Sequence, residues 1–314
     1  ADLHRRDFTI NTLSIRLDSG YYGQLLDFYG GQQDLEEGRI RVLHSLSFIE
    51  DPTRIMRAAR FEQRLDFAIE PRTAELIDDA LPMLTRVTGE RIRHELYLIL
   101  REREPERALC RLEGLNVLAQ IHPRLACREA TWELFAALRQ TVAGGAWDVR
   151  PDENGRPAPG LYLALLTYYL SRPELEALAD HLKIFRHDLI LLRQILGLRG
   201  GEPKLDQPGL SNREIYALLR YSSTPARMIH WLCTGSERVQ ARLWRYETEL
   251  RHVQPAVDGE YLMGLGLKPS PLFRRLLSAV RDARLDGVIH TVKEEKAFID
   301  RLLKEWGEAG GGES

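Results

Sequence analysis

Strand-like alternation of apolar and polar residues is confined to roughly the first 45 residues of this 314-residue chain. Residues 13–17 alternate in this way, and the Asp-Ser-Gly run at 18–20 is typical of a turn. From about residue 46 onward the strand signals vanish, and apolar residues recur with helical spacing, as on one face of residues 90–103. The sequence therefore predicts an α+β fold class, in which a partial α/β segment is followed by an all-α remainder.

Signals for helix starts recur along this second part of the chain. A cap residue before a proline, or a capping-box pair, stands at Asp51-Pro52, Ser211 with Glu214, Thr224-Pro225, and Thr291 with Glu294. Helices are predicted at residues 51–64, 90–103, 105–120, 130–143, 160–171, 173–183 and 187–198. Two segments rich in glycine and proline, Gly144 to Gly160 and Gly197 to Leu210, predict loops and mark boundaries between domains.

Composition is that of an ordinary globular protein. The 44 Lys and Arg nearly balance the 46 Asp and Glu, so the net charge of −2 does not by itself indicate a nucleic-acid-binding protein. Six of the 44 are lysines, and the excess of arginine suits phosphate recognition but equally fits a coding bias. No run of eighteen apolar residues and no signal peptide is present, which favours a cytoplasmic location.

The three cysteines are Cys110, Cys127 and Cys233. They are odd in number, lie far apart, and show neither CxxC nor Cys/His ligand spacing. The sequence therefore predicts three free thiols, with neither a disulfide nor a zinc site.

The strongest chemical signal is the run EDPTRIMRAARF at residues 50–61. Asp51, Arg54, Arg57 and Arg60 recur every three residues, which predicts a slanted ridge of charge about 13 Å long on a helix. A carboxylate accepts and a guanidinium donates, so Asp51 and Arg54 together match the amino group and ring nitrogen that cytosine and adenine share. Uracil and guanine reverse that order and leave buried groups unpaired, at about 1–3 kcal/mol each. In the alternative interpretation Asp51 only caps the helix and the arginines form a solvated face.

Three further runs accompany the ridge in order along the chain. They are RRDFTIN at 5–11, DFYGGQQDL at 27–35 and GERIRHEL at 89–96. In the first, the arginines suit phosphate or ribose oxygens, and Asp7 and Asn11 suit hydroxyl groups. In the second, the paired glycines form a turn that can bend between two rigid parts.

These four runs, in this order and near this spacing, resemble motifs B, C, D and E of the class II tRNA nucleotidyltransferase and poly(A) polymerase family. The resemblance is strong over residues 1–105 and continues more weakly to GEYLMGLGLKPSP at 259–271 and LDG at 285–287. It implies template-independent addition of nucleotides to RNA 3′ ends, with ATP and CTP as substrates, Mg²⁺ as cofactor and tRNA as partner. Poly(A) addition to general RNA and a non-catalytic RNA-binding module remain the alternatives.

The resemblance also implies roles for individual residues and regions. Arg6 and Asp7 would hold triphosphate and ribose, Asp51 and Arg54 would read the incoming base, Arg57 and Arg60 would support the nucleotide and the ridge, and Glu90 with Arg91 would brace the ridge helix. Residues 30–31 would be the hinge of the head. The regions would be the C-terminal part of the head at 1–45, the neck with base recognition at 46–105, the body at 106–200, the RNA-binding tail at 201–306 and a disordered end at 307–314.

One departure from the family pattern concerns catalysis. Motif A of the family, a glycine-rich turn followed by an Asp-x-Asp pair that holds two Mg²⁺ ions, should precede motif B, and residues 1–314 contain no Asp-x-Asp. Two-metal phosphoryl transfer needs those carboxylates. We therefore expect the pair upstream of Ala1, and we expect the chain as written to be inactive.

Weaker features lie in the later helices. Arg238, Arg242 and Arg245 share one predicted helix face, and another cluster contains Arg274, Arg275, Arg281 and Arg284. Both clusters suit the phosphates of a tRNA acceptor stem, and both equally suit a solvated face paired with nearby acids. The pair His187-Asp188 resembles the dipeptide of metal phosphohydrolases, but the other ligands of such a site are not recognisable.

Overall fold

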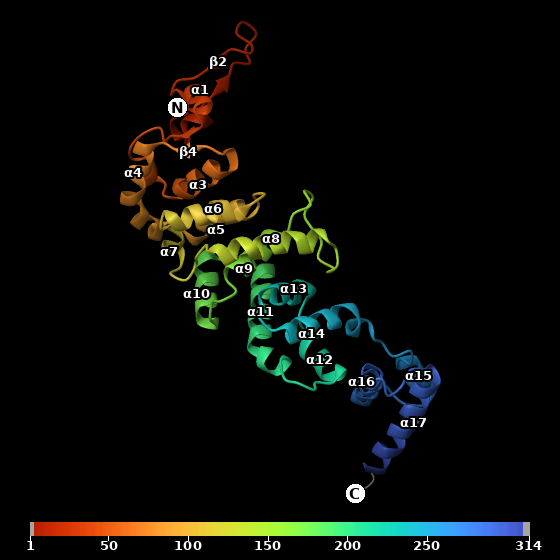
Figure 1. Ribbon diagram of the computed structural model, residues 1–314. Coiled ribbons are helices and arrows are strands. Elements are labelled where there is room, and N and C mark those ends of the chain that lie inside the picture. The colour runs from red at the N-terminus through yellow and green to blue at the C-terminus, as the bar shows by residue number, and fades with distance from the viewer. Residues whose placement is uncertain (1–2, 310–314) are drawn as a thin grey trace. The chain divides into compact units, whose positions relative to one another are not determined.

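The computed structural model describes residues 3–309, and the chain divides into two compact units, Ala1–Leu196 and Gly197–Ser314. Helices predominate in both units, with two pairs of short strands near the N-terminus (Figure 1). The first unit contains η1 (Leu3–Arg5), η2 (Thr9–Asn11), β1 (Ser14–Ile15), β2 (Leu25–Leu26), α1 (Gly31–Glu36), β3 (Arg39–Ile40), α2 (Ser47–Glu50), α3 (Thr53–Leu65), β4 (Ala68–Ile69), α4 (Pro71–Ala80), η3 (Leu81–Arg86), α5 (Gly89–Leu100), α6 (Pro105–Gly114), α7 (Val117–Ile121), α8 (Glu129–Ala143), α9 (Pro159–Leu166) and α10 (Arg172–Leu182). The α+β class predicted from the sequence is confirmed.

The strands form two separate two-stranded sheets. β1 pairs with β2 in antiparallel fashion around the predicted turn, and β3 pairs in parallel with β4. The expectation that strands end near residue 46 is wrong, because β4 lies after α3. Ile69 of β4 is buried and lies opposite Ile40 of β3. This pairing joins segments distant in sequence, and a two-residue strand shows no local period.

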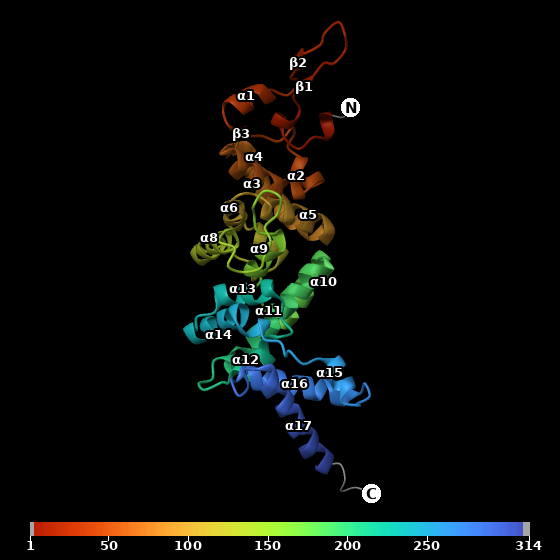
Figure 2. The same cartoon turned by 90° about the vertical axis from the view of Figure 1, so that its right-hand side faces the viewer.

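Helices α3, α5 and α6 form the centre of the first unit. The inner face of α3 carries Ile55, Met56, Ala58 and Ala59, all with no exposed surface. Helix α6 packs along this helix, as both views show (Figures 1 and 2). Across this contact Nε of Arg111 donates to Oε2 of Glu62 at 2.6 Å. The ridge helix is therefore held from behind, and its opposite side is left for the site described below.

The prediction of a loop at Gly197 to Leu210 is wrong over its first part. Helix α11 (Arg186–Leu205) continues through three glycines and contains Pro203, because its apolar side chains are buried at Leu198 and Leu205. Burial outweighs the poor helix propensity of glycine and proline. The predicted helix at 105–120 is instead two helices, α6 and α7, separated at Asn116, whose φ of 58° cannot continue a helix.

The second unit contains the end of α11 and the later helices. These are α12 (Asn212–Leu219), α13 (Thr224–Cys233), α14 (Glu237–Thr248), η4 (Leu250–His252), α15 (Gly259–Gly264), α16 (Pro271–Leu285) and α17 (Val292–Ala309). The capping boxes at Ser211 and Thr291 are confirmed. The cap of α13 is Ser223, one residue before the predicted Thr224, since its hydroxyl accepts the N–H of Ala226. Helices α16 and α17 pack side by side (Figure 2) around the buried residues Leu276, Val280 and Ile299.

Two predictions concern the cysteines and the C-terminal end of the chain. Cys110 and Cys127 form a disulfide and Cys233 is free, so the prediction of three thiols is wrong. Residues 307–309, the start of the end predicted to be disordered, belong to α17, and residues 310–314 lie outside the described part. Among the described residues no helix has the length and apolarity to cross a membrane.

Candidate functional site

The N-terminal segment lies against the start of α3 and one face of α5, and the three together enclose a polar pocket of about 620 Å³. Its lining residues are Arg5, Arg6, Asp7, Asn11, Asp51, Thr53, Arg54, Arg57, Glu90, Arg91, His94 and Glu95. The site residues predicted from RRDFTIN, from the ridge and from GERIRHEL all line this pocket, except Arg60. Five arginines and four carboxylates face one another here, so the pocket offers donors for phosphates beside acceptors for hydroxyl and amino groups.

Asp7 is the most firmly held carboxylate of the pocket. Its Oδ1 accepts the side-chain amide of Asn11 at 2.8 Å and the N–H of Phe8 at 2.9 Å. Its Oδ2 accepts from Nε of Arg57 at 2.7 Å. Burial alone would raise the pKa of Asp7, but the hydrogen bond from Asn11 and the charge of Arg57 outweigh it, and the pKa lies below its ordinary value. Asp7 is therefore a fixed anion that orients Arg57 and Asn11.

Asp51 connects the start of the ridge to α5. Its Oδ1 accepts the N–H of Thr53 at 3.2 Å and the hydroxyl of Thr53 at 2.6 Å. Its Oδ2 accepts from Nη2 of Arg91 at 2.7 Å. The carboxylate thus caps the first turn of α3 from an extended residue before the helix, and α5 fixes its orientation.

Arg54 is also held in place by its surroundings. Its Nη1 donates to the hydroxyl of the buried Ser47 at 2.6 Å, and its Nη2 donates to the backbone carbonyl of Arg5 at 3.1 Å. A guanidinium has five N–H donors, so these contacts leave others for a ligand. The acceptor and the donor that the sequence pairs for base recognition therefore lie in one pocket, each oriented by a second residue.

The structure does not bring Arg60 to the pocket. The side chain of Arg60 is buried, donates to Oε1 of Glu102 at 3.2 Å, and lies over the ring of Phe61. Residues spaced by three are displaced by about 60° around a helix at each step. The series of charged residues therefore leaves the face of α3 that lines the pocket after Arg57. The predicted ridge of four charges therefore ends at Arg57: Asp51 caps the helix start as expected, and Arg60 faces the protein interior.

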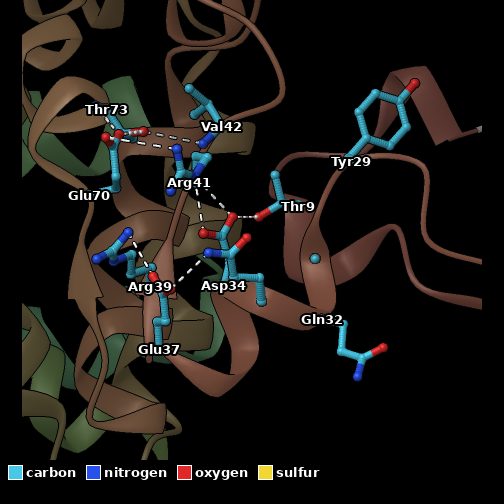
Figure 3. Close-up of polar contacts among 12 residues, drawn as sticks. Thr9, Tyr29, Gln32, Asp34, Glu37, Arg39, Arg41, Val42, Glu70 and Thr73 are labelled. Atoms are coloured by element: carbon cyan, nitrogen blue, oxygen red, sulfur yellow. Dashed lines mark hydrogen bonds and ion pairs between the residues drawn. The ribbon is translucent and has the colours of Figure 1, made fainter.

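A second polar network supports the N-terminal segment from behind (Figure 3). Buried Asp34 accepts the hydroxyl of Thr9 at 2.6 Å and Nε of Arg41 at 3.0 Å. Arg41 also lies 4.0 Å from Glu70, the cap residue of α4. Gly31 approaches this segment so closely that a Cβ there would lie 2.4 Å from the carbonyl oxygen of Thr9. Gly31 is thus required for close packing and begins α1, while Gly30, at a φ of 72°, provides the turn.

Comparison with known proteins identifies the family to which the chain is related. The family described as "Poly A polymerase head domain" matches residues 1–41, and the one described as "Probable RNA and SrmB- binding site of polymerase A" matches residues 66–128. The A-adding tRNA nucleotidyltransferase of Halalkalibacterium halodurans is 30% identical over 95% of this chain and 67% of its own length. The chain belongs to the family of tRNA nucleotidyltransferases and poly(A) polymerases.

Two further members show the extent of the match. The A-adding tRNA nucleotidyltransferase of Geobacter sulfurreducens is 35% identical over 96% of this chain, and the chain spans only 35% of that relative. The solved structure of the Thermotoga maritima CCA-adding enzyme complexed with tRNA is 29% identical, with a TM-score of 0.73 over 97% of this chain and 73% of that one. The likeness to the nucleotidyltransferases thus runs through both units of the chain.

Sequence reasoning missed three residues that line the pocket: Thr53, His94 and Glu95. His94 and Glu95 follow Glu90 and Arg91 by one helical turn, so helical periodicity could have found them. Glu95 accepts from Nη1 of Arg57 at 3.4 Å, and its other oxygen is buried with no hydrogen-bond partner among residues 3–309. Thr53 gives no signal in the sequence beyond its place beside the proline.

The arginines predicted to bind RNA on α14 have partners within the second unit. Arg238 donates to the carbonyl of Asp206 at 2.7 Å, and Arg242 donates to the carbonyl of Leu205. Both carbonyls lie at the end of α11, where the helix leaves its last acceptors unpaired. Arg245 pairs with the exposed Glu249 at 3.3 Å. The chain thus gives Arg238 and Arg242 a structural role, and the binding of RNA by this face stays a prediction.

The arginines of the second cluster also differ in their surroundings. Arg275 lies over the ring of Trp306, and Arg284 pairs with the fully buried Glu295. Arg274, in contrast, lines a second pocket. In the first unit, the dipeptide His187-Asp188 provides a buried carboxylate that accepts the hydroxyl of Tyr97 at 2.5 Å. That contact ties α5 to α11.

Proposed function

We propose that the protein to which this chain belongs adds nucleotides, without a nucleic-acid template, to the 3′ end of tRNA, using ATP and CTP to build a terminal A, CC or CCA. One observation carries the proposal: a single pocket holds Asp51 and Arg54, which match the edges of cytosine and adenine, beside the cationic groups Arg6 and Arg57. Solved relatives complexed with ATP and with CTP, each 29% identical to this chain, support nucleotides as ligands.

The choice of tRNA over general RNA rests on the relatives. Curated relatives that match this chain include A-adding and CC-adding tRNA nucleotidyltransferases, and the Thermotoga structure contains tRNA. The pocket of the first unit binds the triphosphate, and the helical remainder binds tRNA.

The described residues do not fit a two-metal centre. No group of three or more His, Cys, Asp or Glu side chains within residues 3–309 is placed to hold a metal ion. Within the pocket, the carboxylate of Asp7 is committed to Asn11 and Arg57. We therefore derive no catalytic step through Mg²⁺ from these residues. We propose that the 314-residue chain alone does not incorporate nucleotides, and turnover that copurified with it through successive columns would contradict this.

Replacement of Asp51 tests the proposed function. In the longer protein that contains the expected Asp-x-Asp segment, Asp51→Asn keeps the oxygen that accepts from Thr53 but introduces an amide that donates. We expect the melting temperature to stay near that of the parent and discrimination of CTP and ATP against UTP and GTP to fall, because the acceptor for the amino group is weakened.

Asp51→Ala provides the comparison, because it removes both the cap and the acceptor. We expect the same loss of discrimination together with a loss of stability of about 0.5–2 kcal/mol. Incorporation assays with all four nucleotides and thermal unfolding separate the two effects. If Asp51→Asn selects nucleotides as the parent does and Asp51→Ala loses only stability, Asp51 is a cap and the base-reading role is wrong.

A further inference from the structure

The second unit contains a pocket of about 720 Å³ that is lined by two arginines of the second predicted cluster, Arg274 and Arg281. One wall is a stripe along the first half of α16, and the other is the segment before α15. Its lining residues are Pro255, Val257, Asp258, Ser270, Pro271, Phe273, Arg274, Leu277, Ser278 and Arg281. The lining thus combines apolar side chains, one of them aromatic, with two arginines and one aspartate.

The two arginines lie on the same face of α16, seven residues apart, or about 10 Å along the helix axis. Arg274 is exposed and has no hydrogen-bond or ion-pair partner among residues 3–309. Arg281 lies 4.9 Å from the ring centroid of Tyr216, and its Nε is buried without a hydrogen-bond partner among those residues. A buried donor that lacks an acceptor is costly, and an anionic ligand would supply the acceptor.

The one carboxylate of the pocket is already in use. Oδ1 of Asp258 accepts the N–H of Tyr261 at 3.0 Å and caps α15. The pocket therefore has an excess of positive charge beside the apolar side chains of Phe273 and Leu277. A planar ring with phosphates at its sides matches this combination, because bases stack on aromatic rings and guanidinium groups bind phosphate oxygens.

We propose that this pocket receives one unstacked nucleotide of tRNA, whose base lies against Phe273 and Leu277 and whose flanking phosphates pair with Arg274 and Arg281. The proposal rests on the proposed function, which makes tRNA the substrate. A base inside a duplex is stacked on both faces and cannot enter a pocket. The nucleotide therefore comes from a loop or another unpaired position of the tRNA.

Equilibrium binding of an unmodified tRNA transcript to the 314-residue chain tests the proposal with matched variants. Phe273→Leu removes the aromatic ring and keeps an apolar side chain, and Arg274→Ala removes an exposed charge. Arg301→Ala is the control, because it removes the same charge from an exposed position of α17 that does not line the pocket and whose side chain lies over Phe298. We expect Phe273→Leu and Arg274→Ala each to weaken binding by about 5- to 100-fold, and Arg301→Ala to leave it within about twofold.

A second RNA separates stacking from general attraction to phosphates. For a blunt RNA duplex of the same length as the acceptor and T stems, we expect Phe273→Leu to have no effect, since every base is paired. Thermal unfolding of each variant checks that the second unit remains folded. Equal losses for Arg274→Ala and Arg301→Ala, or unchanged tRNA binding by Phe273→Leu, would overturn the pocket proposal alone. Failure of the unaltered chain to bind tRNA at low salt would overturn the proposed function as well.

Discussion

Nη2 of Arg91 lies 2.7 Å from Oδ2 of Asp51, so helix α5 holds the carboxylate that we propose reads the incoming base. The other carboxylate oxygen is held by Thr53. With both oxygens engaged, the plane of the carboxylate is fixed before a nucleotide arrives. Preorganised groups bind a ligand at a lower entropic cost than groups that must first become ordered.

Loss of this contact should affect nucleotide choice more than folding. Arg91→Ala frees the Asp51 carboxylate to rotate, and we expect weaker binding of CTP and ATP and poorer discrimination against UTP. Stability should change by less than about 1 kcal/mol, because the side chain of Arg91 is 52% exposed. Equilibrium binding of the four nucleotides to the 314-residue chain measures the first effect, and urea unfolding measures the second.

Arg193→Ala is the matched control, since Arg193 forms a comparably exposed ion pair with Glu176 at 2.7 Å and does not line the pocket. It should leave nucleotide binding unchanged. If Arg91→Ala behaves like this control in both measurements, Arg91 does not orient Asp51 for binding.

Acid should reveal how much the buried Asp7 carboxylate stabilises the first unit. Burial opposes ionisation, but the hydrogen bond from Asn11 and the charge of Arg57 hold the pKa of Asp7 below that of an unfolded aspartate, which is about 3.9. The ionised form is therefore favoured in the folded state. Its stabilisation is present above pH 4 and disappears as the pH falls through the lowered pKa.

Asp7→Asn removes this contribution. We expect its free energy of unfolding to lie below that of the parent at pH 7, and the difference to shrink progressively below pH 4. Asp78→Asn, a change at an exposed position of α4, is the control and should show no such convergence. Chemical denaturation at several pH values measures all three proteins. A difference between Asp7→Asn and the parent that is constant with pH would contradict the proposed electrostatic role.

Much of the pocket was predictable because its residues belong to short runs whose geometry is local. Asp51, Arg54 and Arg57 lie within two turns of one helix start, so spacing alone places them near one another. Arg60 was wrongly included because spacing does not reveal which face of a helix becomes buried. Only the packing of α3 against α6 and the contact with Glu102 show that Arg60 faces inward.

The other errors have related causes. The pairing of Ile40 with Ile69 and the bond between Cys110 and Cys127 both depend on contacts between distant segments. Counting and spacing of cysteines assign no partner when the intervening fold is unknown. The helical course of α11 through Pro203 reflects burial of neighbouring apolar residues, which outweighs local propensity.

The disulfide gives a direct test of stability. Cys110 and Cys127 are 17 residues apart, and closure of a loop of this length restricts the unfolded chain by about 3 kcal/mol in the chain-entropy account. We therefore expect dithiothreitol to lower the melting temperature of the first unit. Cys110→Ser with Cys127→Ser should lower it similarly and abolish the response to dithiothreitol.

Cys233→Ser is the control for this experiment and should respond to dithiothreitol as the parent does. Burial raises the pKa of the Cys233 thiol to about 12, so this thiol should also react slowly with alkylating agents at pH 8. Two rapidly alkylated cysteines in the unreduced protein would contradict the bond between Cys110 and Cys127.

The arginines of α14 can be divided by experiment into structural and RNA-binding residues. Arg238 and Arg242 donate to the carbonyls of Asp206 and Leu205 at the end of α11, and cations near a helix C-terminus stabilise it. The double change to Ala should therefore lower the stability of the second unit by about 1–2 kcal/mol. Arg245, whose ion-pair partner Glu249 is on the exposed surface, is the residue of the three best placed for a phosphate.

Salt dependence distinguishes these roles, because each phosphate contact that is lost lowers the slope of log K against log salt by about 0.7–0.9. We expect Arg245→Ala to reduce the slope of tRNA binding by about one such step without changing the melting temperature. The double variant, measured at a temperature where it is fully folded, should keep the slope of the parent. If the slope of the double variant instead falls by two such steps, and its melting temperature equals that of the parent, the contacts with α11 do not keep Arg238 and Arg242 from binding phosphates. The whole face of α14 would then bind RNA, as the spacing of the three arginines predicts.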